Sequence, residues 1–147
     1  MATKEKKIER KEPAFTHILK GVQVSVNPRD KWALVTLVDE DGELLEDAEA
    51  LVEESPAEVN IVDGVALFRL SKFAKFAFGD ENKSYGLDAH EDEDINLDGN
   101  GTANIKVRHA DYDWTYKKKS GHTSCLEIIG IRFLDFEEYD GNELSGL

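Results

Sequence analysis

The stretch TANIKVRHADYDWTYKKKSGHTSCLEIIGIRFLDF, residues 102–136, decides the fold that we predict for this chain. Its first half alternates in character, with Ala103, Ile105, Val107 and His109 on one face and Asn104, Lys106 and Arg108 on the other. Its second half is apolar on both faces over part of its length, and the connector between the halves ends in a Ser120-Gly121 turn. Period-two alternation with β-branched and aromatic residues is typical of strands. We therefore predict a long β-hairpin whose second arm lies inside a sheet.

Two further strands are predicted on the N-terminal side of this hairpin. The first covers residues 17–26, with Val22, Val24 and Val26 on one face and Ile18 and Lys20 continuing the same register. The segment Asn27-Pro28-Arg29-Asp30 has the residues of a turn. The second strand covers residues 32–38 and is apolar on both faces.

The region between the second strand and the hairpin changes period. Apolar residues at 44, 45, 48, 51 and 52 share one face of a helix over residues 43–54, which Pro56 ends. Asp63-Gly64 then suits a type I′ turn in a hairpin over residues 59–65. Residues 71–78 fit either a short helix or a strand, and residues 79–101 form a long Gly- and Asp-rich loop.

Together these segments predict a mainly β fold. We expect an OB-like antiparallel barrel or curved sheet of five to six strands, with one helix and a long acidic loop. The domain division is a charged flexible arm at residues 1–13, a single β-rich domain at 14–136 and a short acidic tail at 137–147.

Composition limits the class of protein. The chain has 147 residues, of which 40% are hydrophobic and 33% charged, as in a soluble globular domain. Its N-terminus lacks an apolar signal region, no stretch is apolar enough for a membrane helix, and Cys125 stands alone. We expect a cytoplasmic protein, in the host cytoplasm if it is viral. The net charge of −13 opposes nucleic-acid binding at long range, but the basic residues are clustered, so charge alone does not decide.

No residue pattern supports an enzyme or a cofactor. Residues 94–102 resemble the first half of a calcium-binding EF-hand loop, but position 12, where the loop needs Glu, is Ile105. A solvated acidic loop is the alternative, and the pattern leaves calcium at Asp94 and Asp98 open. His122 and Cys125, with His109 across the hairpin, fall short of a zinc site, and a small thiol beside a turn histidine is the simpler interpretation.

Aromatic residues interleaved with basic ones are the remaining functional pattern. Tyr112, Trp114 and Tyr116 are spaced by two and precede three lysines, and Phe73, Phe76 and Phe78 alternate with basic residues. Aromatic side chains stack bases while cations follow phosphates, which is how sequence-tolerant single-strand binding works. Alternatively, the phenylalanines fill the core and the lysines keep a hairpin soluble. The predicted nucleic-acid-binding residues are Trp114, Tyr116, Tyr112, Lys106, Arg108, Lys117, Lys118, Lys119, Lys72 and Lys75.

The pattern of residues 101–138 resembles the C-terminal hairpin of phage-type single-stranded DNA-binding proteins with an OB-fold: a strand with an aromatic pair, a Lys/Gly-rich turn, an apolar strand and an acidic segment. The resemblance implies a protein that binds single-stranded DNA in phage-type replication or recombination. It also implies replication proteins as partners of the acidic tail, and a homo-oligomer is compatible with it. The helix at 43–54 comes earlier in the chain than the usual OB helix.

Two other functions stay open from sequence. The acidic total fits a nucleic-acid mimic that inhibits a host DNA-acting enzyme, and a virion assembly component is neither supported nor excluded. Within the DNA-binding hypothesis, we expect the segment from Asp135 onward to begin near the DNA groove. Its acids would then occupy the Lys117–Lys119 patch when DNA is absent.

Overall fold

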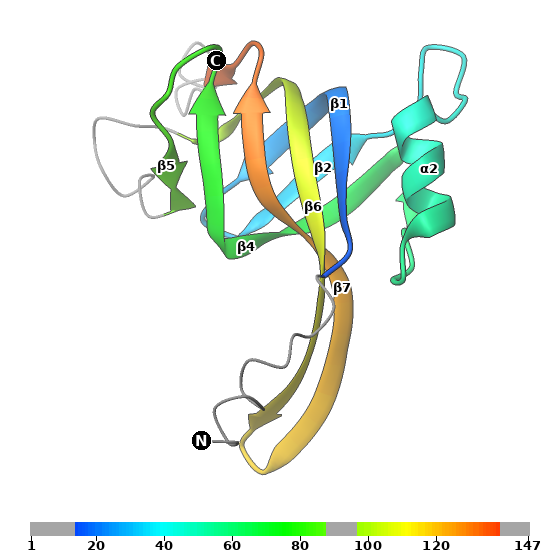
Figure 1. Cartoon of the computed structure of the whole chain (residues 1–147), viewed down its shortest axis with the longest axis vertical. Coiled ribbons are helices and arrows are strands. Elements are labelled where there is room, and N and C mark those ends of the chain that lie inside the picture. Colours follow the sequence, from blue (N-terminus) through cyan, green and yellow to red (C-terminus); the bar gives the residue numbers. More distant parts are fainter. Residues whose placement is uncertain (1–13, 88–96, 139–147) are drawn as a thin grey trace, which may run out of the picture.

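A strongly curved sheet forms the body of the protein in the computed structural model, which describes residues 14–87 and 97–138 (Figure 1). Its long strands are β1 (Thr16–Asn27), β2 (Trp32–Thr36), β4 (Val65–Phe78), β6 (Gly99–Tyr116) and β7 (Lys119–Phe133). They pair in the order β1-β2-β4-β7-β6, and β6 pairs again with β1, so hydrogen bonding runs around a ring. Of these pairings only β4–β7 is parallel. The mainly β fold with a curved sheet and one helix, predicted from sequence, is confirmed.

Three two-residue strands and one helix complete the described elements: β3 (Ile61–Val62), β5 (Tyr85–Gly86), β8 (Glu137–Glu138) and α2 (Glu46–Glu54). The helix forms within the predicted span and buries Ala48 and Leu51. Its first turn is tied to β1, because the Asp47 carbonyl lies 2.8 Å from the His17 imidazole and the Asp47 carboxylate accepts the Lys20 amide. This anchor places α2 beside one end of the ring, away from the hairpin tip (Figure 1).

Two tight turns have residues with positive φ. Asp63 and Gly64, with φ of 53° and 81°, connect β3 to β4 and pair Val62 with Val65, so the predicted hairpin there is confirmed. Lys117 and Lys118, with φ of 47° and 65°, connect β6 to β7. The turn is therefore not at Ser120-Gly121, as predicted, because these two residues pair with Thr115 and Trp114 inside the hairpin.

Register shifts explain two other differences from the sequence pattern. In β1 the pairing with β6 shifts between Leu19 and Val22, where Gly21 has a φ of 63°. The face therefore changes at this bulge, so that Leu19 is buried and Ile18 is 48% exposed, and Ile18 does not share the face of Val22 as predicted. In β7 the pairing skips Ile129, and this shift lets Ile128 and Ile131 both face the core. The sequence of β7 therefore looks apolar on both faces because a bulge interrupts the alternation.

Residues 71–78, which fitted either a helix or a strand by sequence, are a strand and form the second half of β4. The predicted long loop is shorter than expected, because Gly99 and Asn100 already belong to β6 and pair with β1 and β8. Residues 88–96, together with the N-terminal arm 1–13 and residues 139–147, lie outside the described residues. No described helix has the length and apolar character needed to cross a membrane.

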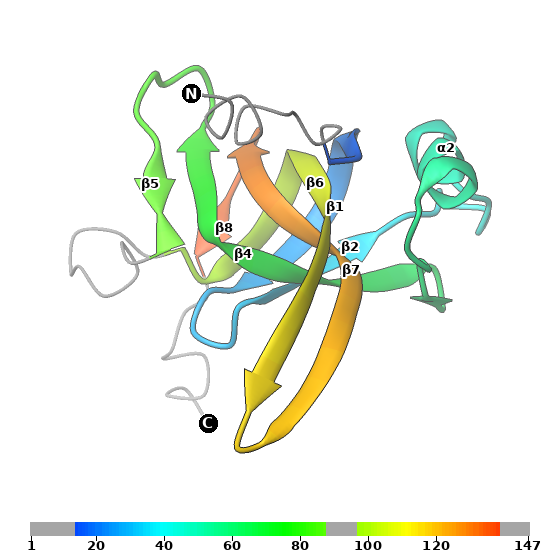
Figure 2. The ribbon, with the colours of Figure 1, turned by 60° about the horizontal axis from the view of Figure 1, so that its bottom comes forward.

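The hairpin of β6 and β7 extends beyond the ring as a two-stranded arm, seen at the bottom of Figure 1 and at the front of Figure 2. Two contacts mark where the hairpin leaves the ring. On β6, the His109 amide donates to the carbonyl of Phe15, just before β1. On β7, Glu127 is the first residue that pairs with β4. We call residues 110–126 the arm. A two-stranded hairpin is marginally stable by itself in water, so the arm depends on its continuous strands and on its side chains.

Candidate nucleic-acid interface

One face of the arm carries the aromatic residues that sequence analysis selected. Tyr112, Trp114 and Tyr116 project to the same side and are 41%, 41% and 64% exposed. Their cross-strand partners are Thr123, Gly121 and Lys119. The Lys117 ammonium lies 5.3 Å from the centroid of the Tyr116 ring, a cation–π contact at the tip. The predicted aromatic and basic tip is therefore assembled on one surface.

A cleft of about 420 Å³ continues from the base of the arm onto the ring. Its walls come from the β1–β2 turn, β4, β6 and β7. They carry four cationic side chains and one carboxylate, as well as two aromatic rings: Lys31, Arg69, Lys72, Arg108, Glu127, Phe73 and Tyr112. Cations thus exceed acids locally in a chain whose net charge is −13. We call this surface the basic cleft.

Arg69 is the residue that links the arm to the ring. It pairs in register with Trp32 of β2 and Glu127 of β7. Its guanidinium donates to the Tyr112 hydroxyl at 3.4 Å and lies 3.8 Å from the Glu127 carboxylate. The side chain is 58% exposed, so solvent weakens this ion pair and the guanidinium remains open to an anion.

Phe73 faces the cleft because β4 is irregular beside it. The pairing of β4 with β7 shifts between Leu70 and Lys75, and the Phe73 amide donates to the Ser71 hydroxyl. Lys72 and Phe73 are consecutive and both exposed, which regular alternation does not allow. The Lys72 ammonium lies 5.1 Å from the centroid of the Phe73 ring. The register shift in β4 therefore lets two consecutive residues, Lys72 and Phe73, both line the cleft.

The other two phenylalanines of this set belong to the core. Phe76 is fully buried, and the rings of Phe78 and Phe133 stack with their centroids 5.5 Å apart. The core-filling alternative therefore holds for Phe76 and Phe78, and the stacking hypothesis keeps only Phe73.

Lys75 and Lys106 lie apart from the other predicted residues. Both line a separate depression of about 300 Å³, together with Ile18, Gly130 and Arg132. Of the ten predicted residues, the structure brings Arg108, Lys72 and Tyr112 together at the basic cleft, and Trp114, Tyr116 and Lys117–Lys119 at the tip.

The opposite face of the arm is polar. Both ring nitrogens of His122 contact carboxylates, Nδ1 meeting Asp113 at 2.7 Å and Nε2 meeting Asp111. The hydrogen bond with Asp113 is the main cause that raises the pKa of His122 above its usual 6.5, and the negative charge of Asp111 adds to the rise. Two acceptors facing one imidazole favour the imidazolium form, in which both nitrogens donate.

The described residues form no set of ligands for either zinc or calcium. His109 lies against the Ser124 hydroxyl at 2.7 Å, His122 contacts the two aspartates, and Cys125 faces the other side of β7. No group of three or more metal-ligating side chains converges within residues 14–87 and 97–138. Asp94 and Asn96, two of the proposed calcium ligands, lie in residues 88–96, outside the described part.

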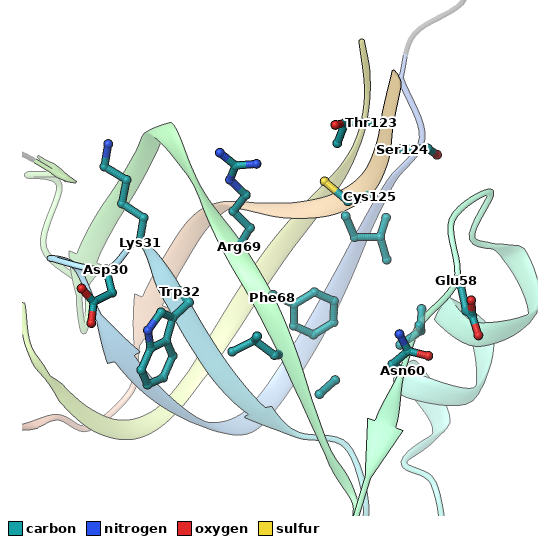
Figure 3. A pocket seen from close by; sticks show the side chains of 14 residues that line it. Asp30, Lys31, Trp32, Glu58, Asn60, Phe68, Arg69, Thr123, Ser124 and Cys125 are labelled. Carbon is teal, nitrogen blue, oxygen red and sulfur yellow. The ribbon is translucent and has the colours of Figure 1, made fainter. Parts of the chain in front are cut away.

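A second hollow, of about 710 Å³, adjoins the basic cleft and shares Lys31 and Arg69 with it (Figure 3). Trp32 and Asp30 lie at one end, Asn60 and Glu58 at the other, and Phe68 between them. Cys125 lines the side formed by β7, where burial is the main cause that raises the pKa of its thiol. We call this hollow the side groove.

The acidic C-terminal segment begins far from the tip. Glu137 and Glu138 form β8 against Asn100 and Gly99, at the opposite end of β6 from Lys117. The expectation that this segment begins near the DNA groove, within reach of the Lys117–Lys119 patch, is therefore wrong. The stretch of 139–147 spans at most about 30 Å, whereas β6 at about 3.3 Å per residue is roughly 55–60 Å long. Contact with Lys117–Lys119 in the same molecule is therefore not expected.

The predicted binding residues omitted Arg69, Lys31 and Trp32, which the structure places at this interface. Lys31 enters the cleft because its φ of 59° lets the turn fold back onto β4, where the Leu70 amide donates to the Lys31 carbonyl. Trp32 was assigned only to a strand, although an aromatic residue next to Lys31 repeats the pattern used elsewhere. Comparisons with protein-family models, with curated proteins and with solved structures yield no match to this chain.

Proposed function

We propose that this protein binds single-stranded DNA with tolerance for sequence, through the basic cleft and the aromatic face of the arm. The observation that carries the proposal is the continuity of the two surfaces. Tyr112, bonded to Arg69, belongs to both, so one extended strand can contact Phe73, Tyr112 and Trp114 in turn. Aromatic rings stack any base, and the surrounding cations attract phosphates.

The position of the surface in the fold supports the same function. The basic cleft and side groove use the β1–β2 turn, β2, β4 and the β6–β7 hairpin. In the OB architecture, oligonucleotides bind the face of the second and third strands and the loops that join strands one to two and four to five. If the five long strands are numbered in chain order, β2 and β4 are the second and third. The β1–β2 turn and the β6–β7 hairpin are then the two loops.

Lys72 and Lys117 occupy the faces of Phe73 and Tyr116 in the free protein. A base that stacks on either ring displaces the ammonium group, which then has a phosphate as its new partner. The exchange replaces one weak contact with two and favours the nucleic acid.

The test is a titration with oligo-dT at low salt, using the two tryptophans as separate reporters. Trp32→Phe leaves Trp114 as the only indole, and Trp114→Phe leaves Trp32. We expect quenching in both variants, affinity that falls as salt rises, and a slope of about −0.7 per phosphate contact on logarithmic axes. Replacement of Lys117, Lys118 and Lys119 by Gln should weaken binding more than replacement of Lys75 and Lys106.

Absence of quenching and of any mobility shift at low salt would remove the proposal. Tight binding to a basic DNA-acting enzyme under the same conditions would instead support the acidic inhibitor, which rests on the net charge. A role in phage-type replication or recombination, with replication proteins as partners, remains a proposal drawn from the resemblance of the hairpin.

A further inference from the structure

The side groove has polar side chains that the fold leaves unused. Glu58, Asn60 and Thr123 line it and make no side-chain hydrogen bond or ion pair with the described residues. Of the other polar groups, Asp30 accepts from Asn27 and Ser124 contacts His109. A carboxylate, an amide and a hydroxyl are therefore available to a ligand.

Apart from Lys31 and Arg69, the remaining walls of the groove are apolar or aromatic. Phe68 is buried beneath it, Leu67 is 64% exposed, and Trp32 stands at one end. A hollow of about 710 Å³ is large enough for a nucleobase, and its mixture of apolar walls and a few hydrogen-bonding groups is typical of sites for small ring systems. The groove is continuous with the basic cleft through Arg69 and Lys31, where phosphates would lie.

The charge of the groove decides what enters it. Glu58, at the end of the groove away from Lys31, repels phosphate, so the backbone of a bound strand stays on the side of Arg69 and Lys31 and only a base turns in. A carboxylate accepts from an exocyclic amino group, and an Asn amide both donates and accepts. Thymine and uracil present a carbonyl oxygen in place of that amino group, and this oxygen would face the Glu58 carboxylate unfavourably.

Building on the proposed function, we infer that the side groove takes one base of the bound strand and selects bases that carry an exocyclic amino group. Binding is then sequence-tolerant along the arm and selective at one position. Glu58 and Asn60 are the residues that determine this selectivity.

The experiment compares dU12 with the same oligonucleotide carrying a single dC, since the two bases differ only at the amino-bearing edge. The single cytosine can slide into the groove, so we expect the substituted strand to bind about five- to tenfold more tightly, in the range of one good base contact. Glu58→Gln and Asn60→Ala should reduce this ratio to near one while binding of dU12 is kept. Glu53→Gln on α2, which makes the same change in charge away from the groove, should leave the ratio unchanged.

Equal affinity for both strands overturns the selectivity and leaves the proposed function standing. A preference for dC that survives in both groove variants also overturns it. If neither oligonucleotide binds at low salt, the proposed function and this inference fail together.

Discussion

The indole of Trp114 lies across Gly121, its partner on the opposite strand of the arm. A Cβ atom at Gly121 would come within 2.5 Å of the Trp114 ring, so the ring covers the backbone where a side chain would stand. An aromatic ring over a cross-strand glycine recovers some of the packing that glycine lacks. The orientation of the proposed stacking residue therefore depends on a missing methyl group.

Gly121→Ala should displace the Trp114 ring and weaken binding of oligo-dT. Measured in the Trp32→Phe background, the emission of Trp114 should shift toward the red as the ring loses its cover. Gly130→Ala is the matched control, because its new Cβ would find its nearest neighbours at 4.0 Å. Unchanged emission and affinity in Gly121→Ala would contradict this role of the glycine.

Phe76→Ala and Phe73→Ala should separate stability from binding within one strand. Phe76 is fully buried, and its removal should cost about 3–5 kcal/mol of unfolding free energy. Phe73 is 67% exposed, so its removal should change stability by no more than about 0.5 kcal/mol but lower the affinity for oligo-dT. Denaturant melts and fluorescence titrations measure the two effects. Normal affinity in Phe73→Ala would exclude this ring from the interface.

His122 should titrate above 6.5 in the folded protein, chiefly because of its hydrogen bond with Asp113. A group whose pKa is raised by folding stabilises the fold fully below its unfolded pKa, and this contribution is lost as pH rises through the folded pKa. The arm should therefore loosen as pH rises through the folded pKa of His122. Histidine NMR signals followed against pH check the midpoint, and Asp113→Asn should lower it. An unchanged midpoint in that variant would exclude Asp113 as the cause.

Cys125 should react slowly with iodoacetamide at neutral pH, because burial raises the pKa of its thiol and leaves little thiolate. The rate should increase as pH rises. Since Cys125 lines the side groove, a bound oligonucleotide that contains cytosine should slow the reaction further, and mass spectrometry of the modified chain measures both effects. Alkylation at the same rate with and without a saturating strand would place the strand elsewhere.

Removal of residues 139–147 should leave the affinity of the protein for oligo-dT within about twofold at low salt. The reason is the reach of the chain, since β8 lies at the far end of β6 from the lysines of the tip. Truncation after Glu138 keeps β8, and gel-shift titrations of the two chains make the comparison. A several-fold gain on truncation would show that these residues compete for the DNA surface after all.

Local patterns predicted most of the elements, because they depend on nearby residues alone. The Asp63-Gly64 turn, the α2 helix and the strand of Val22, Val24 and Val26 follow from turn chemistry and hydrophobic period. The bulges at Gly21 and Ile129 are different, since a register shift is fixed by the strand on the other side. For the same reason sequence analysis placed Ile18 on the wrong face.

The candidate site also combines a part that local sequence predicts with a part that depends on contacts between distant strands. Trp114, Tyr116 and the three lysines form a continuous stretch, and their shared surface follows from strand alternation. The basic cleft joins Lys31 to Arg108, and only the pairing of distant strands brings them together. The irregular pairing that exposes Phe73 beside Lys72 has no sequence marker that we can identify.

The pairing of β1 with β6 also sets an order of events during synthesis. Thr16 pairs with Arg108 and Val26 with Gly99, so the first strand must wait for residues far downstream of it. Before β6 and β7 leave the ribosome, β1, β2 and β4, with the short β3 and β5, can form only an open sheet with unpaired edges. Such contacts between distant residues slow folding, and open strand edges favour aggregation. A nascent chain stalled ahead of β6 would therefore be the form of this protein most in need of a chaperone.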